Sequence, residues 1–147
     1  DPSLIPGLVD EAIRWMTPVK HFMRSATEDA EVAGQKIAKG DWLMINYVAA
    51  NHDPAQFPDP RRFDAARSPN RHLAFGAGAH QCLGLHLARL EMKVFIEEWV
   101  RRIPAFSVDA EGELPTRGGL VWSPVKVPLV WPSDATVAPA NAAGAPT

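Results

Sequence analysis

The sequence predicts a mixed α+β fold that is mainly α with small β-sheets, and three features of the chain indicate this class. Two segments, residues 5–16 and the stretch that follows Cys82, repeat apolar residues at helical spacing. Between residues 19 and 46, short β-type runs alternate with turn residues. A chain of 147 residues is long enough to bury one hydrophobic core. We therefore expect two main helices with small sheets beside them.

The first expected helix covers Ile5 to Met16. Its apolar residues fall on two adjacent faces, with Leu8, Ala12 and Trp15 on one and Val9, Ile13 and Met16 on the other. Thr17 precedes Pro18, and a residue before proline is disfavoured in helical conformation, so the helix is expected to end there. The helix also carries Glu11 and Arg14, which are three residues apart and share a face.

The middle of the chain is expected to hold short strands followed by an irregular segment. From residue 19 to residue 46 the expected turns are Gly34 and residues 39–41, because glycine and aspartate favour turns. Residues 51–70 carry four prolines and little periodicity. This composition predicts a packed meander without regular secondary structure.

The second expected helix begins at Cys82 and ends at Pro104. Its apolar stripe is formed by Leu83, Leu87, Leu90 and Val94, and two acid–base pairs four residues apart support it, Glu97–Arg101 and Glu98–Arg102. Short strands are expected around residues 106–108, 120–122 and 127–131. Residues 133–147 are rich in alanine and proline and are expected to be disordered, which leaves residues 1–132 as the folded part.

The composition limits the partners and the location. With 15 basic and 17 acidic residues the net charge is −2, which predicts neither a nucleic-acid partner nor an anionic membrane partner. No apolar run approaches the length of a membrane span, and no secretory signal is visible. The single cysteine fits a reducing compartment, so a cytoplasmic location is expected. The chain begins Asp1-Pro2 without a methionine and is expected to be a piece of a longer protein.

The residues around Cys82 form the most informative segment of the chain. Residues 75–84 read F-G-A-G-A-H-Q-C-L-G, so the only cysteine follows a glycine-rich loop and precedes a helix. The positive end of a helix dipole and its free N–H groups stabilise a thiolate. Gly76, Gly78 and Gly84 remove side chains where a flat, bulky group would approach the backbone.

The pattern F-G-x-G-x-H-x-C-x-G resembles the haem-binding loop of the cytochrome P-450 family, in which the cysteine sulfur is the axial iron ligand. Further motifs stand in the family's order along residues 5–131: the E-x-x-R helix, the strand region, the N-H-D-P segment at 51–54, the meander, and a closing hairpin at 119–131. The wording C-L-G-L-H-L-A-R-L-E after the loop resembles the soluble bacterial type. The resemblance implies that residues 1–132 are the C-terminal portion of the cytochrome P-450 fold, an incomplete domain.

The same resemblance implies a set of site residues and haem b as the cofactor. Cys82 is the expected catalytic residue and iron ligand, within a cofactor-binding set of Arg24, His72, Phe75, Gly76, His80, Cys82 and Gly84. Within this set Arg24, His72 and His80 are the expected partners of the haem propionates. Glu11, Arg14 and Arg62 are expected to form a buried structural network, and Val19, Leu120 and Val121 are candidates for the substrate pocket.

The implied function is that of a haem-thiolate monooxygenase. Such an enzyme inserts one oxygen atom from O2 into a substrate, here a hydrophobic small molecule of terpene, steroid or fatty-acyl type, because the pocket candidates are apolar. Electrons would come from NAD(P)H through a reductase and a ferredoxin or flavodoxin-type partner. The long helix that activates oxygen in the family is absent from this chain.

Three alternatives remain at this stage. In the first, the chain is a haem-binding or inert truncated fragment without catalysis. In the second, it shares only the fold of the family, and its cysteine does not ligate iron. A zinc site formed by His72, His80, Cys82 and His86 is the third. Zinc would leave the glycine pattern unexplained, and the chain holds no second cysteine.

Overall fold

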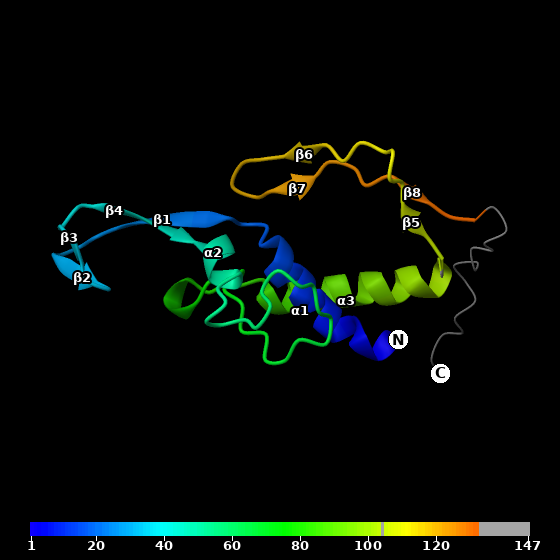
Figure 1. Cartoon of the computed structure of the whole chain (residues 1–147), viewed down its shortest axis with the longest axis horizontal. Helices are drawn as coiled ribbons and strands as arrows, with labels where there is room; N and C mark the ends of the chain where they lie inside the picture. The colour runs from blue at the N-terminus through cyan, green and yellow to red at the C-terminus, as the bar shows by residue number, and fades with distance from the viewer. Residues whose placement is uncertain (104, 133–147) are drawn as a thin grey trace.

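The computed structural model describes residues 1–103 and 105–132 (Figure 1). These residues form three α-helices, α1 (Ile5–Met16), α2 (Tyr47–Asn51) and α3 (Leu85–Arg102), and two short 3-10 turns, Pro2–Leu4 and Gly78–His80. The expected class, mainly helical with small sheets, is confirmed. The expected disordered tail at 133–147 and the expected helix stop at Pro104 lie outside the described residues.

Four small antiparallel sheets of two strands each accompany the helices in the described part of the chain. Their strands pair as β1 (His21–Ser25) with β4 (Trp42–Asn46), β2 (Ala30–Val32) with β3 (Gln35–Ile37), β5 (Ser107–Val108) with β8 (Leu129–Val130), and β6 (Thr116–Arg117) with β7 (Ser123–Pro124). The expected turns between the strands are present, and Gly34 and Gly40 adopt positive φ angles of 81° and 92° there. No helix or strand lies between Asn51 and Gly78, so the expected meander is confirmed.

The core lies between α1 and α3, which contact each other and cross in Figure 1. Ile5, Val9 and Ile13 repeat every four residues along one face of α1, and each is at most 5% exposed. Ala74, Phe75, Met92 and Ile96 pack against them. Segment 74–75 immediately precedes the glycine-rich loop, so the loop starts from the core itself.

Helix α1 ends where the sequence predicted. Thr17 follows its last turn with a left-handed φ of 40°, and its N–H donates to the Ile13 carbonyl at 2.9 Å. The Thr17 hydroxyl also donates to the Arg14 carbonyl at 2.6 Å. The chain therefore leaves the helix in a fixed direction, toward Pro18 and the first sheet.

The helix predicted after Cys82 is present as α3, but the apolar stripe that predicted it does not pack on α1. The expected residues are exposed, Leu83 at 100%, Leu87 at 59%, Leu90 at 55% and Val94 at 47%. The helix starts at Leu85, so Leu83 precedes it, and the face that packs on α1 carries Met92 and Ile96 instead. Apolar residues stand on both faces of α3, so the periodic pattern did not identify the face turned to α1.

The ion pairs of α3 also differ in part from the expected ones. Glu98 pairs with Arg102 at 2.9 Å as predicted, and it pairs with Arg101 as well. Glu97 lies 3.8 Å from Lys93 rather than beside Arg101. All of these side chains are partly exposed, so the pairs contribute little to the stability of the fold.

Helix α2 is an element that the sequence reasoning missed. It begins after Asn46, whose side-chain oxygen accepts the Ala49 N–H at 3.0 Å. Asparagine is a preferred residue at the N-cap of a helix, so Asn46 was the sequence signal from which this helix could have been predicted. The helix ends with Asn51, which is fully buried, so this short turn carries a polar side chain into the core.

Candidate functional site

The glycine-rich loop folds back on itself in front of α3. Gly76 and Gly78 adopt left-handed φ angles of 68° and 64°, which glycine tolerates best. A β-carbon at Gly76 would also come within 3.3 Å of the His80 carbonyl oxygen. The Cys82 N–H donates to the Phe75 carbonyl at 2.8 Å and closes the loop. Cys82 itself is a free, exposed cysteine.

A cavity of about 460 Å³ opens in front of the Cys82 side chain. Residues from α1, from the start of the first sheet, from the loop and from α3 line it: Ile13, Pro18, Val19, Phe22, Tyr47, Ala74, Phe75, Gly76, His80, Cys82, Ala88 and Met92. Most of these side chains are apolar. The structure therefore brings five of the predicted residues to one cavity, namely Val19, Phe75, Gly76, His80 and Cys82.

Four further predicted residues do not line this cavity, but their positions relate them to residues that do. A β-carbon at Gly84 would lie 4.0 Å from the Cys82 sulfur, so the glycine keeps this side of the sulfur free. Arg24 lies two residues after Phe22 on β1, which places both on one face of the strand, and it is half-buried. Val121 forms an isolated antiparallel bridge with Val19, which carries the hairpin to the cavity rim. Leu120 is 64% exposed beside it.

The expected role of His72 as a propionate partner does not agree with its position. Its side chain is only 1% exposed. The Nδ1 atom accepts the Ala74 N–H at 3.3 Å, which leaves the proton on Nε2, and Nε2 lies 3.5 Å from the Asp10 carboxylate. Burial lowers the pKa of His72, and this effect exceeds the opposing influence of Asp10. His72 is thus occupied by protein partners on both ring nitrogens.

A buried ion pair anchors α1 to the meander. Glu11 and Arg14 are both 0% exposed, and Arg14 donates to the two Glu11 oxygens from Nε at 2.8 Å and from Nη2 at 2.7 Å. The carboxylate also accepts the Asp64 N–H at 2.9 Å and the Asn70 amide at 3.1 Å. These donors replace the hydration that burial removes.

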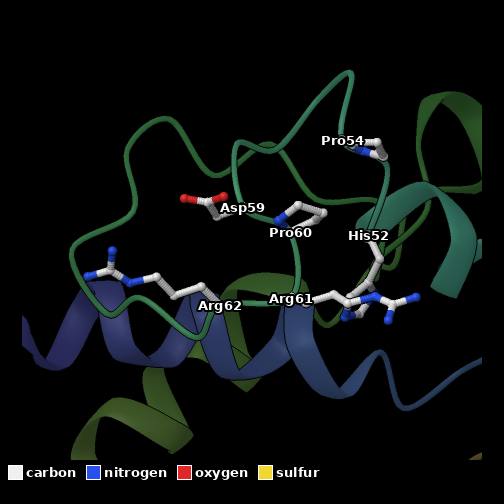
Figure 2. Close-up of a pocket in the computed structure, with 6 residues that line it drawn as sticks. All are labelled: His52, Pro54, Asp59, Pro60, Arg61 and Arg62. Carbon is white, nitrogen blue, oxygen red and sulfur yellow. The ribbon is translucent and has the colours of Figure 1, made fainter.

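The third member of this network is Arg67, and the prediction of Arg62 is wrong. Arg67 Nε lies 3.2 Å from each Glu11 oxygen, and its side chain is 8% exposed. Arg62 is exposed, and in Figure 2 its side chain extends along the surface of the meander. Arg62 contributes its backbone instead, because its carbonyl accepts from Arg67 at 3.0 Å and from Arg14 at 3.5 Å.

The arginines supply the donors that the meander lacks. A segment without helix or strand leaves its carbonyls unpaired, and buried ones need partners. Arg14 Nη1 donates to the carbonyls of Asn51 at 2.7 Å and Pro60 at 3.0 Å. Arg67 Nη1 donates to the Pro58 carbonyl at 2.7 Å. The network therefore fixes the path of the meander as well as its own charges.

Asn51 links this network to the loop, and the sequence reasoning did not identify it. Its amide donates to the Thr17 hydroxyl at 2.9 Å, and its side-chain oxygen accepts the Leu73 N–H at 2.6 Å. One buried side chain thus joins the end of α1 to the chain just before the glycine-rich loop. The signal was Asn51 at the start of a proline-rich segment, where a buried amide has backbone groups to satisfy.

A second hollow, of about 560 Å³, lies on the outer side of the meander (Figure 2). It is lined by His52, Pro54, Asp59, Pro60, Arg61 and Arg62. Figure 2 shows the side chains of Arg61 and Arg62 extending in opposite directions from neighbouring positions. With two arginines against one aspartate, this surface is more basic than the chain as a whole.

The pKa of Glu11 is far below its usual value. Burial alone would raise it, but hydrogen bonds from Arg14, the Asp64 N–H and Arg67 outweigh that effect and lower the pKa from 4.5 to about 2. The carboxylate is therefore charged at neutral pH.

This pKa predicts a loss of stability in acid. A carboxyl with a depressed pKa in the folded state stabilises the fold above its unfolded value and loses that contribution as the pH falls from 4.5 to about 2. The contribution is roughly 3 kcal/mol. The free energy of unfolding, measured in urea at a series of pH values, should fall across this window, and the Glu11→Gln variant should show a much smaller fall. Equal slopes for the two proteins would contradict this account.

The donor set at the cavity fits a haem group. A haem iron takes one protein ligand on one side, and Cys82 offers one sulfur at the edge of an apolar cavity. Among the described residues, no cluster of three or more histidine, cysteine or acidic side chains is placed to hold a metal ion. Within the same residues, no helix has the length and apolar character needed to cross a membrane.

Comparison with known proteins places this site in a family. The sequence pattern of the cytochrome P450 family matches residues 3–127. Cytochrome P450-terp from a Pseudomonas species is 50% identical over 129 residues, which are 88% of this chain and 30% of that protein. Steroid C26-monooxygenase from Mycobacterium tuberculosis is 45% identical over 118 residues, 80% of this chain and 32% of that protein. The crystal structure of CYP108D1 from Novosphingobium aromaticivorans matches with 58% identity and a TM-score of 0.83, over 90% of this chain and 32% of that one.

The fold and the loop thus define a haem-protein class, and the chain belongs to the cytochrome P450 family. Membership of this family implies a haem cofactor. The chain spans about a third of the length of the relatives that it matches. The predicted resemblance to a part of a bacterial cytochrome P-450 is confirmed.

Proposed function

We propose that this chain forms the cysteine side of the haem site of a cytochrome P450 monooxygenase, with Cys82 as the axial iron ligand. The observation that carries the proposal is the position of Cys82, the only cysteine of the sequence, at an apolar cavity between the loop, α1 and α3. When bound, the haem supplies the activation of O2 from which one oxygen atom enters the substrate.

The residues around the cavity have separate roles in this proposal. Phe75 and Gly76 leave room for a flat ring and hold the loop, and Gly84 keeps the sulfur uncovered. Arg24 and His80 are the proposed partners of the haem propionates, because His80 is a polar group in an otherwise apolar cavity and Arg24 is a cation on the same face of β1 as Phe22, which lines that cavity. Haem b is the proposed form of the cofactor.

The proposed substrate is a hydrophobic small molecule. Val19 lines the cavity, and its bridge with Val121 holds the hairpin that carries Leu120 and Val121 against the segment after α1. Apolar residues at the rim favour an apolar ligand. Two named relatives, a steroid C26-monooxygenase and a methyl-branched lipid omega-hydroxylase, act on compounds of this kind.

The proposed electron source is NAD(P)H, through a ferredoxin or flavodoxin-type partner and its reductase. Arg61 and Arg62 on the outer side of the meander form a basic surface, which suits an acidic partner. A cytoplasmic location accompanies this proposal, because such partners and the nicotinamide cofactor are found there.

The alternative is a haem-binding segment without catalysis. The exposed apolar stripe of α3, which includes Leu87, Leu90 and Val94, favours it for the isolated chain, because the described residues leave these side chains in solvent.

Isotope incorporation tests the monooxygenase proposal. The longest reading frame that carries this chain is expressed with haem, supplied with NAD(P)H, ferredoxin and reductase, and given a panel of steroids, terpenes and fatty acids under ¹⁸O2. A product with one ¹⁸O atom, absent for Cys82→Ser, supports the proposal. Haem-loaded protein that forms no such product from any compound of the panel favours the non-catalytic alternative.

A further inference from the structure

One carboxylate on α1 contacts both sides of the glycine-rich loop. Asp10 accepts a hydrogen bond from Arg89 Nε at 2.7 Å, and its same oxygen lies 3.5 Å from His72 Nε2. His72 precedes the loop and Arg89 lies on α3 after it. Asp10 therefore joins the two segments between which Cys82 stands.

The two partners of Asp10 both lie beside the ring of Phe75. The Arg89 guanidinium carbon lies 5.2 Å from the centroid of that ring, and the His72 ring centroid lies 5.9 Å from it. A cation at this distance is attracted by an aromatic face. The position of the Phe75 ring thus depends on where Asp10 holds Arg89.

Phe75 in turn contacts the cysteine. Its carbonyl accepts the Cys82 N–H at 2.8 Å, and its side chain lines the same cavity as the Cys82 sulfur. A shift of Phe75 would therefore move the backbone that orients the sulfur, and would change one wall of the cavity.

We propose that Asp10 is a positioning residue for the cysteine loop, which fixes Arg89 and His72 against Phe75 and neutralises the Arg89 charge beside that ring. The proposal rests on the proposed role of Cys82 as the haem ligand. Asp10 and Arg89 are 34% and 35% exposed in their side chains, so the pair is open enough to be replaced without burying a lone charge.

The charges of Asp10 and Arg89 predict the direction in which each variant shifts the reduction potential of the haem. Without Asp10 the Arg89 guanidinium is uncompensated, and a positive charge near a haem favours the reduced iron, which has one positive charge fewer. Without Arg89 the Asp10 carboxylate is uncompensated and acts in the opposite direction. Removal of both groups restores the balance.

The test is the haem reduction potential of four variants in the longest protein that carries this chain. Asp10→Asn should shift the potential upward and Arg89→Gln downward, and the double variant should lie between them, near the native value. Asp10→Glu should stay near the native value because it keeps the charge. Glu98→Gln is the matched control, since it removes a carboxylate from an arginine pair on α3 that does not contact the loop.

Two further results would contradict this account in different ways. One would show that Asp10 has a purely structural role, and the other would show that Cys82 is not the haem ligand. If Asp10→Asn and Arg89→Gln lose thermal stability while the potentials of both single variants match the native value, the positioning role is overturned. The Arg89 variant gives a second, independent measurement of the same coupling. A native protein that holds haem without a thiolate-type spectrum would instead overturn the assignment of Cys82, on which the proposal depends.

Discussion

Replacement of Arg14 by methionine is expected to lower the free energy of unfolding by about 3 to 5 kcal/mol, because it leaves the Glu11 carboxylate buried without its main partner. Arg14 is 0% exposed and also donates to the Asn51 and Pro60 carbonyls, which lose their donor in the variant. Urea unfolding followed by circular dichroism gives the free energy, and haem content per protein gives the consequence for the site. Methionine fills most of the space, so the effect reports lost charge and hydrogen bonds rather than a cavity.

Arg101→Met is the matched control for this experiment. Arg101 also pairs with a glutamate three residues away on a helix, but its side chain is 38% exposed. Exposed pairs contribute about 0.2 to 1 kcal/mol, so this variant should remain close to the native protein. Equal losses for Arg14→Met and Arg101→Met would show that the Glu11–Arg14 pair does not anchor the meander.

Arg67→Ala is expected to destabilise the protein by about 3 kcal/mol, whereas Arg62→Ala should change its stability by less than about 0.5 kcal/mol. Arg67 donates to Glu11 and to the Pro58 and Arg62 carbonyls, all of which lose a donor in the variant. The Arg62 side chain is exposed, and alanine keeps the carbonyl that the network uses. Urea unfolding of the two variants in parallel measures the difference.

Arg67→Lys separates charge from geometry at the same position. Lysine keeps the positive charge beside Glu11, but it has no fork of donors to reach several carbonyls at once. An intermediate loss of stability is expected. A larger effect for Arg62→Ala than for Arg67→Ala would restore the original assignment of Arg62 and contradict the geometry of the meander.

The sequence identified the elements whose signals are local. Helix α1 was predicted from Ile5 to Met16 and has those bounds, because its apolar period and the Thr17-Pro18 stop act within a few residues. The turns at Gly34 and Gly40 follow from the need for positive φ angles. The glycine pattern before Cys82 is of the same kind, since Gly76 and Gly78 adopt the positive φ angles that the loop needs at these positions.

The misassignment of Arg62 has a different origin. Within an irregular segment no period tells which side chain turns inward. The Arg62 N–H donates to the Asp59 carbonyl at 2.9 Å, and Asp59 has a positive φ of 47°. This turn directs the Arg62 carbonyl inward and leaves its side chain outside, so Arg67 reaches Glu11 instead.

The roles of His72 and α3 likewise depend on contacts between distant segments. His72 lies 62 residues from Asp10 in sequence, and no local pattern relates the two. The stripe of Leu87, Leu90 and Val94 is a true apolar face, but the described residues leave it exposed. Periodicity identifies a face that avoids water and does not identify the segment that covers it.

The absorption spectrum of the reduced, carbon monoxide-bound protein tests the central claim most directly, that Cys82 ligates haem through its sulfur. The longest protein that carries this chain is purified after expression with haem, beside its Cys82→Ser variant. The account predicts a long-wavelength Soret band for the native protein and its loss in the variant, because only the thiolate donates enough electron density to produce it. A haem spectrum that is the same for both proteins would contradict the account.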